Sequence, residues 1–161
     1  MTAGRVIAIA AVLAVIGVPS TWRQGSGAER STADGVYSEL QANRGQALFG
    51  RKCHECHGET LEGGSLAPTL RGSEFLSSWQ GKPLRRIYSR ILSTMPPDDV
   101  GSLAENETLD LVALVLRANG YPAGSQPLAR ADELNAIVVA PPPERRDQIT
   151  SNAETAETAE H

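Results

Sequence analysis

The sequence predicts an all-α fold built from three to four helices. Two segments place apolar residues at helical spacing and are bounded by residue types that begin or end helices, and a further helix is expected directly before the cysteines. The sequence contains no alternating pattern of useful length for a β-strand, and no internal repeat at a period of roughly 20–50 residues. Only 4% of the residues are aromatic, although 40% are hydrophobic. Because aromatic side chains bury the largest areas, we expect a large apolar ligand to help fill the core.

The first helix is expected over residues 36–52, directly before a stretch that holds both cysteines and two of the three histidines. Residues 58–73 contain four glycines and one proline and are expected to form a loop. The second helix starts at Pro83, which suits a first turn. It ends before two prolines, which favour an extended backbone at the preceding Met95. Its apolar face consists of Leu84, Ile87, Tyr88, Ile91 and Leu92.

The third helix is expected within residues 104–121, where an Asn-Gly pair supplies a stop signal. Its periodic apolar positions are Leu109, Val112, Ala113 and Leu116. Residues 122–143 hold a short apolar stretch before three prolines and are expected to lie extended against the domain. Residues 144–161 repeat Ala-Glu-Thr and have almost no apolar content, which predicts a disordered acidic tail.

The N-terminal residues 1–20 have the features of a signal peptide or an N-terminal anchor. A basic residue precedes the 13-residue apolar run Val6–Val18, which matches a signal-peptide core and is short for a membrane span. Residues 21–35 are small and polar, and we expect them to link this segment to a domain over residues 36–121. Export would place the cysteine pair in an oxidising compartment. We therefore expect a periplasmic protein, either soluble or tethered to the membrane by its N-terminal segment.

The acidic charge of the chain is concentrated at its C-terminal end. Residues 35–120 carry nine basic and ten acidic side chains, whereas residues 121–161 carry three basic and seven acidic ones. Nucleic-acid binding needs a basic surface, which this composition does not provide. Nucleic acid is therefore not an expected partner.

The stretch Cys53-His-Glu-Cys56-His57 permits three interpretations. A thioredoxin-type dithiol accompanies a βαβ pattern, and no strand is expected before Cys53. A structural zinc site takes four ligands, usually from two separated pairs, and the chain has no second Cys/His pair. The third interpretation is C-x-x-C-H, the attachment motif for c-type haem. In that case both thiols would bond to the porphyrin vinyl groups, and His57 would reach the iron.

Met95 is the candidate for the second axial ligand of such an iron. It is the only methionine besides the initiator, and it lies 38 residues after His57. A lone methionine usually fills a core. Here the two prolines that follow it favour a fixed loop and a directed side chain.

These residues resemble the class I c-type cytochromes over roughly residues 36–121. Gly45-Gln-Ala-Leu-Phe49 matches the family's Gly-x-x-x-aromatic pattern, in which the glycine allows a close crossing with the C-terminal helix. Pro68 matches the proline whose carbonyl accepts the N–H of the proximal histidine. The resemblance therefore implies a cytochrome c-like fold of three to four helices around one covalently attached haem c, with His57 and Met95 as iron ligands.

The resemblance also suggests residues near the haem propionates, namely Trp79 and Arg71. For Trp79 the alternative is a tryptophan that packs in the core. Within the family, residues 75–103 resemble the small mono-haem cytochromes associated with periplasmic quinoprotein dehydrogenases. The chain departs from the family at Leu114, where an aromatic residue is frequent, and at Ala104, where Ser or Asp commonly caps the helix. Both departures concern helix stability and leave the haem-binding pattern intact.

Together these features predict a single-electron carrier and not an enzyme, because a His/Met-ligated iron has no vacant position for a substrate. A dehydrogenase donor and an oxidase or cytochrome acceptor are the expected partners. Two alternatives stay open: a haem-bearing subunit fixed in a dehydrogenase or oxidase complex, and a haem enzyme or gas sensor if Met95 does not bind. A further set of cations is expected to form a solvated helix face, with steering of an acidic redox partner as the alternative. These are Lys82, Arg85, Arg86 and Arg90.

Overall fold

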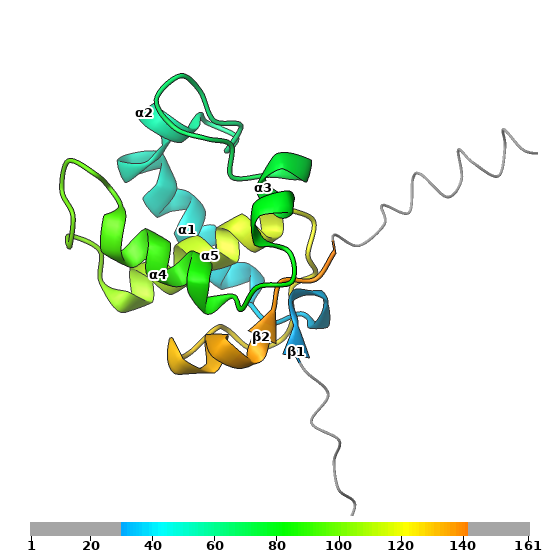
Figure 1. The fold of residues 1–161 in the computed structure, drawn as a ribbon. Helices are drawn as coiled ribbons and strands as arrows, with labels where there is room; N and C mark the ends of the chain where they lie inside the picture. Colours follow the sequence, from blue (N-terminus) through cyan, green and yellow to red (C-terminus); the bar gives the residue numbers. More distant parts are fainter. Residues whose placement is uncertain (1–29, 142–161) are drawn as a thin grey trace, which may run out of the picture.

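The computed structural model describes residues 30–141, which are mostly helical (Figure 1). Its α-helices are α1 (Glu39–Lys52), α2 (His54–His57), α3 (Gly72–Trp79), α4 (Arg85–Thr94) and α5 (Glu105–Ala118). The short elements are the 3₁₀ helices η1 (Thr32–Asp34) and η2 (Asp132–Ala136) and the two-residue parallel strands β1 (Arg30–Ser31) and β2 (Ile137–Val138). This composition confirms the predicted all-α class. The predicted signal peptide or anchor and the acidic tail lie outside the described residues.

The three predicted helices correspond to α1, α4 and α5. α1 begins at Glu39 because Ser38 is extended and caps it, accepting a hydrogen bond at 3.3 Å from the Gln41 N–H. α5 begins after Ala104, which has no side-chain oxygen to cap the helix. Instead, the Ala104 N–H donates to the Glu107 carboxylate at 3.0 Å, so half of a capping box is present.

The short helix α3 was not predicted, and its first residue lies inside the expected loop of residues 58–73. It has eight residues, of which Phe75 and Leu76 are buried. Two buried positions are too few to establish a helical period in the sequence. α3 nevertheless shapes the fold, because it carries Phe75 and Trp79 toward the centre of the molecule.

α1 and α5 cross in close contact at the centre of the fold (Figure 1). A Cβ added at Gly45 would lie 2.1 Å from the carbonyl oxygen of Asp110 and 3.0 Å from Cβ of Leu114. Glycine is therefore required at this crossing, which confirms the role expected for Gly45. Leu114, the departure from the usual aromatic residue, is 1% exposed and packs here.

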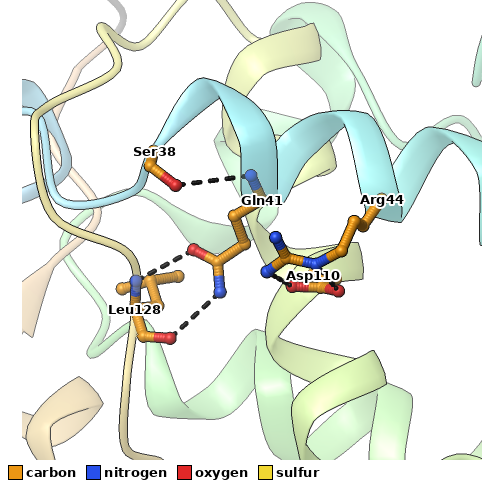
Figure 2. A network of polar contacts seen from close by, with 5 residues as sticks. All are labelled: Ser38, Gln41, Arg44, Asp110 and Leu128. Carbon is orange, nitrogen blue, oxygen red and sulfur yellow. Dashed lines mark hydrogen bonds and ion pairs between the residues drawn. The ribbon is translucent and has the colours of Figure 1, made fainter.

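The C-terminal segment, residues 122–141, packs against α1 and the α3–α4 connection. The Gln41 amide holds it through both of its polar atoms: Nε2 donates to the Leu128 carbonyl at 3.0 Å, and the Leu128 N–H donates to Oε1 at 2.9 Å (Figure 2). Figure 2 also shows Arg44 on α1 in a two-point ion pair with Asp110 on α5, with both contacts at 2.8 Å. The segment was expected to be extended, but it includes the 3₁₀ helix η2.

Residues 30–35 are part of the fold, whereas the sequence predicted a linker through residue 35. Thr32 is fully buried, and its hydroxyl accepts a hydrogen bond from the Ala140 N–H at 3.0 Å. β1 pairs with β2, so the beginning and end of the described chain lie side by side (Figure 1). The residues that contact this segment lie more than 100 positions later in the chain. Local composition does not reveal such distant contacts, and it therefore suggested a linker. Within residues 30–141, no helix combines the length and apolarity needed to cross a bilayer.

Candidate functional site

A cavity of about 1110 Å³ lies among all five α-helices and the loop that follows α2. Six of the seven predicted site residues line it, and they are Cys53, Cys56, His57, Pro68, Trp79 and Met95. Arg71 does not line it; this side chain is exposed at the start of α3. The structure thus brings the predicted ligand set together and leaves Arg71 outside.

His57 is 8% exposed and stands at the end of α2. The turn from Cys53 orients it, because the His57 N–H donates to the Cys53 carbonyl at 3.0 Å. Its ring Nδ1 lies 3.0 Å from the carbonyl oxygen of Pro68. A carbonyl oxygen can only accept, so Nδ1 carries a proton, and in the neutral imidazole Nε2 then keeps a free lone pair. This is the arrangement that a metal-binding histidine needs.

The loop after α2 is folded tightly enough to place the Pro68 carbonyl. The Gly63 N–H donates to the His57 carbonyl at 2.8 Å, and the Leu70 N–H donates to the Leu61 carbonyl at 2.9 Å. Gly63 has a φ of 79°, and a Cβ there would lie 2.4 Å from the backbone nitrogen of Thr69. Glycine is therefore needed at this position, both for its backbone conformation and for the close approach of the chain.

Asn119 also fixes this loop, a role that sequence reasoning missed. Its side-chain Nδ2 donates to the Leu70 carbonyl at 2.9 Å, and its Oδ1 accepts from the Gly72 N–H at 3.0 Å. Asn119 was interpreted only as part of a helix stop signal. No local pattern reveals that its amide reaches a loop more than 45 residues earlier in the chain.

The two thiols are free and partly buried. Burial, with a smaller contribution from Cys56, raises the pKa of Cys53 to about 11 against the opposing effect of Lys52. Redox dithiols have a lowered pKa, so this environment disfavours the thioredoxin-type interpretation. Within the part of the chain that the structure describes, no group of three or more His, Cys, Asp or Glu side chains is placed to hold a metal ion.

Met95 follows α4 with an extended backbone, φ −122° and ψ 147°, as the following proline predicts. The cavity between it and His57 has largely apolar walls. They are formed by Phe49, Phe75, Ile87, Ile91, Leu111 and Val115. An imidazole with one free nitrogen, a thioether, two thiols and apolar walls are the groups that covalent attachment and axial ligation of a haem require. The residues present therefore fit a haem c.

Trp79 lines the cavity while packing on the core, so it has features of both roles considered for it. Its ring centroid lies 6.1 Å from that of Phe75, and the Lys82 Nζ lies 5.8 Å above the Trp79 ring. Sequence reasoning did not place Leu66 at the site, although it lies only two residues before Pro68. Leu66 lines the cavity and is 76% exposed.

Comparison with known proteins assigns the domain. Residues 40–115 match the family described as cytochrome C oxidase, cbb3-type, subunit III. No curated protein matches the chain by sequence. Among solved structures, the sulfane dehydrogenase SoxCD from Paracoccus pantotrophus is similar, with 21% identity over 72% of this chain and 68% of that chain and a TM-score of 0.45. The family match confirms the resemblance on which the site was predicted: the chain contains a c-type cytochrome domain, which carries covalently bound haem c and serves in electron transfer.

Proposed function

We propose that this protein is a single-electron carrier whose haem is attached through Cys53 and Cys56 and ligated by His57 and Met95. The observation that carries this proposal is the convergence of these four side chains on one cavity, with the His57 ring held by the carbonyl of Pro68. When bound, the haem supplies an iron that takes up and releases one electron.

The residues of the cavity favour electron transfer over chemistry at the metal. The hydrogen bond from Nδ1 to Pro68 fixes the His57 ring and raises the basicity of Nε2. The Met95 thioether is a soft donor that would favour ferrous iron and raise the reduction potential. The apolar walls exclude water and disfavour the extra charge of the oxidised state. With both protein ligands supplied by His57 and Met95, the iron would keep no position open for a substrate, and we propose a carrier and not an enzyme.

We further propose that the protein is exported to the periplasm, where it passes electrons from a dehydrogenase to an oxidase or another cytochrome. The basic residue and apolar run within residues 1–20 support export. Export also agrees with the fact that c-type proteins receive their haem outside the cytoplasm. The same N-terminal segment is a candidate membrane tether.

A haem-bearing subunit of a fixed complex is the second candidate function. The specific support is that the matched family is itself described as an oxidase subunit. Purification of the tagged protein from its native membranes and soluble extract at physiological salt separates the two candidates. A free carrier elutes alone, whereas a fixed subunit brings stoichiometric partner chains that persist through a second column.

Mass spectrometry of the protein exported by a host with haem-maturation machinery tests the attachment. We expect one haem mass that survives acidified acetone, located on the peptide that contains Cys53 and Cys56. The double variant Cys53→Ala/Cys56→Ala should lose it. A potentiometric titration of the intact protein should then show one wave of one electron. Two free or mutually bridged thiols in the exported protein would contradict the proposal.

A further inference from the structure

The α4 side of the cavity carries a line of positive charges. Lys82, Arg86 and Arg90 recur every four residues, and all three are exposed and line the cavity. The surrounding stretch, residues 75–97, contains four basic residues and no acidic one. We refer to Lys82, Arg86 and Arg90 as the α4 basic stripe.

The charges of the stripe are not neutralised by ion pairs within residues 30–141. The pairs found there join Arg44 to Asp110, Arg117 to Glu39 and Arg130 to Asp132. Lys82 Nζ instead donates to the backbone carbonyl of Ser78 at 2.6 Å, which leaves its charge uncompensated.

Acidic residues also line the cavity, but they lie on other segments. Glu55 belongs to α2, Glu74 belongs to α3, and Asp98 and Asp99 follow α4. Two further cations, Arg51 and Lys52, line the cavity at the end of α1, where they donate to the Ala47 carbonyl and the Ser102 hydroxyl. The rim is therefore polarised, with positive charge along α4 and at the end of α1 and negative charges on α2, α3 and the segment after α4. A polarised rim orients an approaching charged molecule, because an incorrect orientation would bring like charges together and they would repel.

We propose that the α4 basic stripe is the docking face for a redox partner whose contact surface is acidic. This inference rests on the proposed electron-carrier function. Three uncompensated cations within about one Debye length of a docked protein raise the rate of encounter at low salt, and screening by salt removes the effect. Leu66, which is 76% exposed at the same cavity, adds an apolar contact of the kind that small transient interfaces use.

Reversal of two charges in the stripe tests the proposal in the haem-loaded protein. The variant is Arg86→Glu/Arg90→Glu, and the matched control is Arg30→Glu/Arg130→Glu. Both change the net charge equally, but the control residues do not line the cavity. Stopped-flow oxidation is measured with anionic hexacyanoferrate(III) and cationic tris(phenanthroline)cobalt(III). The ratio of the two rates separates electrostatics from a change in reduction potential, because a change in potential moves both rates in the same direction.

At low ionic strength we expect the anion-to-cation rate ratio to fall at least about tenfold in the stripe variant and to change less than about twofold in the control. The tenfold difference should disappear at about 0.5 M salt. Poly-L-glutamate, which represents an acidic polypeptide surface, should slow oxidation of the wild type and the control but not of the stripe variant.

Equal rate ratios in both variants, or equal inhibition by poly-L-glutamate, would overturn the docking proposal. These outcomes are distinct from a failure of the proposed function. That failure would show in the wild-type visible spectrum, as missing haem or an open iron position, before any rate is measured.

Discussion

The ring Nδ1 of His57 lies 3.0 Å from the carbonyl oxygen of Pro68, although eleven residues separate them in the chain. This contact determines which nitrogen of the ring is free, and it depends on the fold of the loop between the two residues. The predictions below concern the parts of the molecule that hold this geometry.

Gly63→Ala should disturb the His57–Pro68 contact. The new Cβ would lie 2.4 Å from the backbone nitrogen of Thr69, the residue after Pro68. Gly72→Ala is the matched control, because both glycines have a φ of 79° but nothing lies within 4 Å of a Cβ at Gly72. We expect Gly63→Ala to raise the reduction potential more than Gly72→Ala does, because a weakened bond to Pro68 makes Nε2 a poorer donor to oxidised iron. We also expect it to lower the urea midpoint more, both measured on the haem-loaded proteins. Equal effects would show that only backbone conformation matters at Gly63.

Gly45→Ala should destabilise the protein by about 1–3 kcal/mol, because its Cβ would meet the Asp110 carbonyl at 2.1 Å. Gly50→Ala in the same helix is the control, since a Cβ there meets nothing within 4 Å. The control should gain about 0.5–1 kcal/mol from helix propensity. Urea unfolding followed by circular dichroism measures both. A stabilising effect of Gly45→Ala would contradict the close crossing of α1 and α5.

Gln41→Leu should lower the free energy of unfolding by about 2–4 kcal/mol, because it leaves the buried N–H and carbonyl of Leu128 without partners. Hydrogen exchange at Leu128 should accelerate in the same variant. Gln46→Leu serves as the control, because Gln46 is exposed and accepts only a 3.4 Å hydrogen bond from Arg117. We expect this control to stay within about 0.5 kcal/mol of the wild type. Protected exchange at Leu128 in Gln41→Leu would show that the C-terminal segment is held by other contacts.

The free energy of unfolding should decrease at alkaline pH because Tyr37 is harder to ionise in the folded protein than in the unfolded chain. Burial, and then the charge of Glu39, raises the pKa of Tyr37 to about 12 against the effect of Arg117, compared with 10.0 for a free tyrosine. The unfolded chain therefore loses this proton first, so the stabilisation is complete below pH 10 and is lost as the pH rises toward 12.

Tyr37→Phe tests this dependence by urea unfolding at several pH values. The variant should lose about 1 kcal/mol at pH 8, because the wild-type hydroxyl donates to the Tyr121 carbonyl at 2.8 Å. Between pH 9 and 11, the free energy of unfolding should then fall by about 1 kcal/mol less in the variant than in the wild type. Parallel curves for the two proteins would contradict the raised pKa.

The sequence predicted the features that depend on short-range patterns. The helical periods of α4 and α5, the extended backbone at Met95 and the need for glycine at position 45 follow from neighbouring residues or from a family pattern, and the structure confirms them. The convergence of His57, Pro68 and Met95 on one cavity was likewise expected from the resemblance.

What the sequence did not reveal depends on contacts between distant residues. Gln41 binds Leu128 across 87 positions, and Asn119 binds Gly72 across 47. No periodicity encodes such pairs. The resemblance suggested Arg71 as a propionate contact, but its place at the start of α3 leaves it outside the cavity. In a loop, the spacing of residues does not determine the direction of a side chain, so the sequence could not show whether Arg71 faces the cavity.

The binding of carbon monoxide to the reduced haem protein tests the central claim most directly. The account predicts that the wild type resists carbon monoxide because His57 and Met95 occupy both axial positions, and that Met95→Ala binds it readily with a changed visible spectrum. Wild-type protein that binds carbon monoxide as readily as Met95→Ala would contradict the account and would favour a haem enzyme or gas sensor.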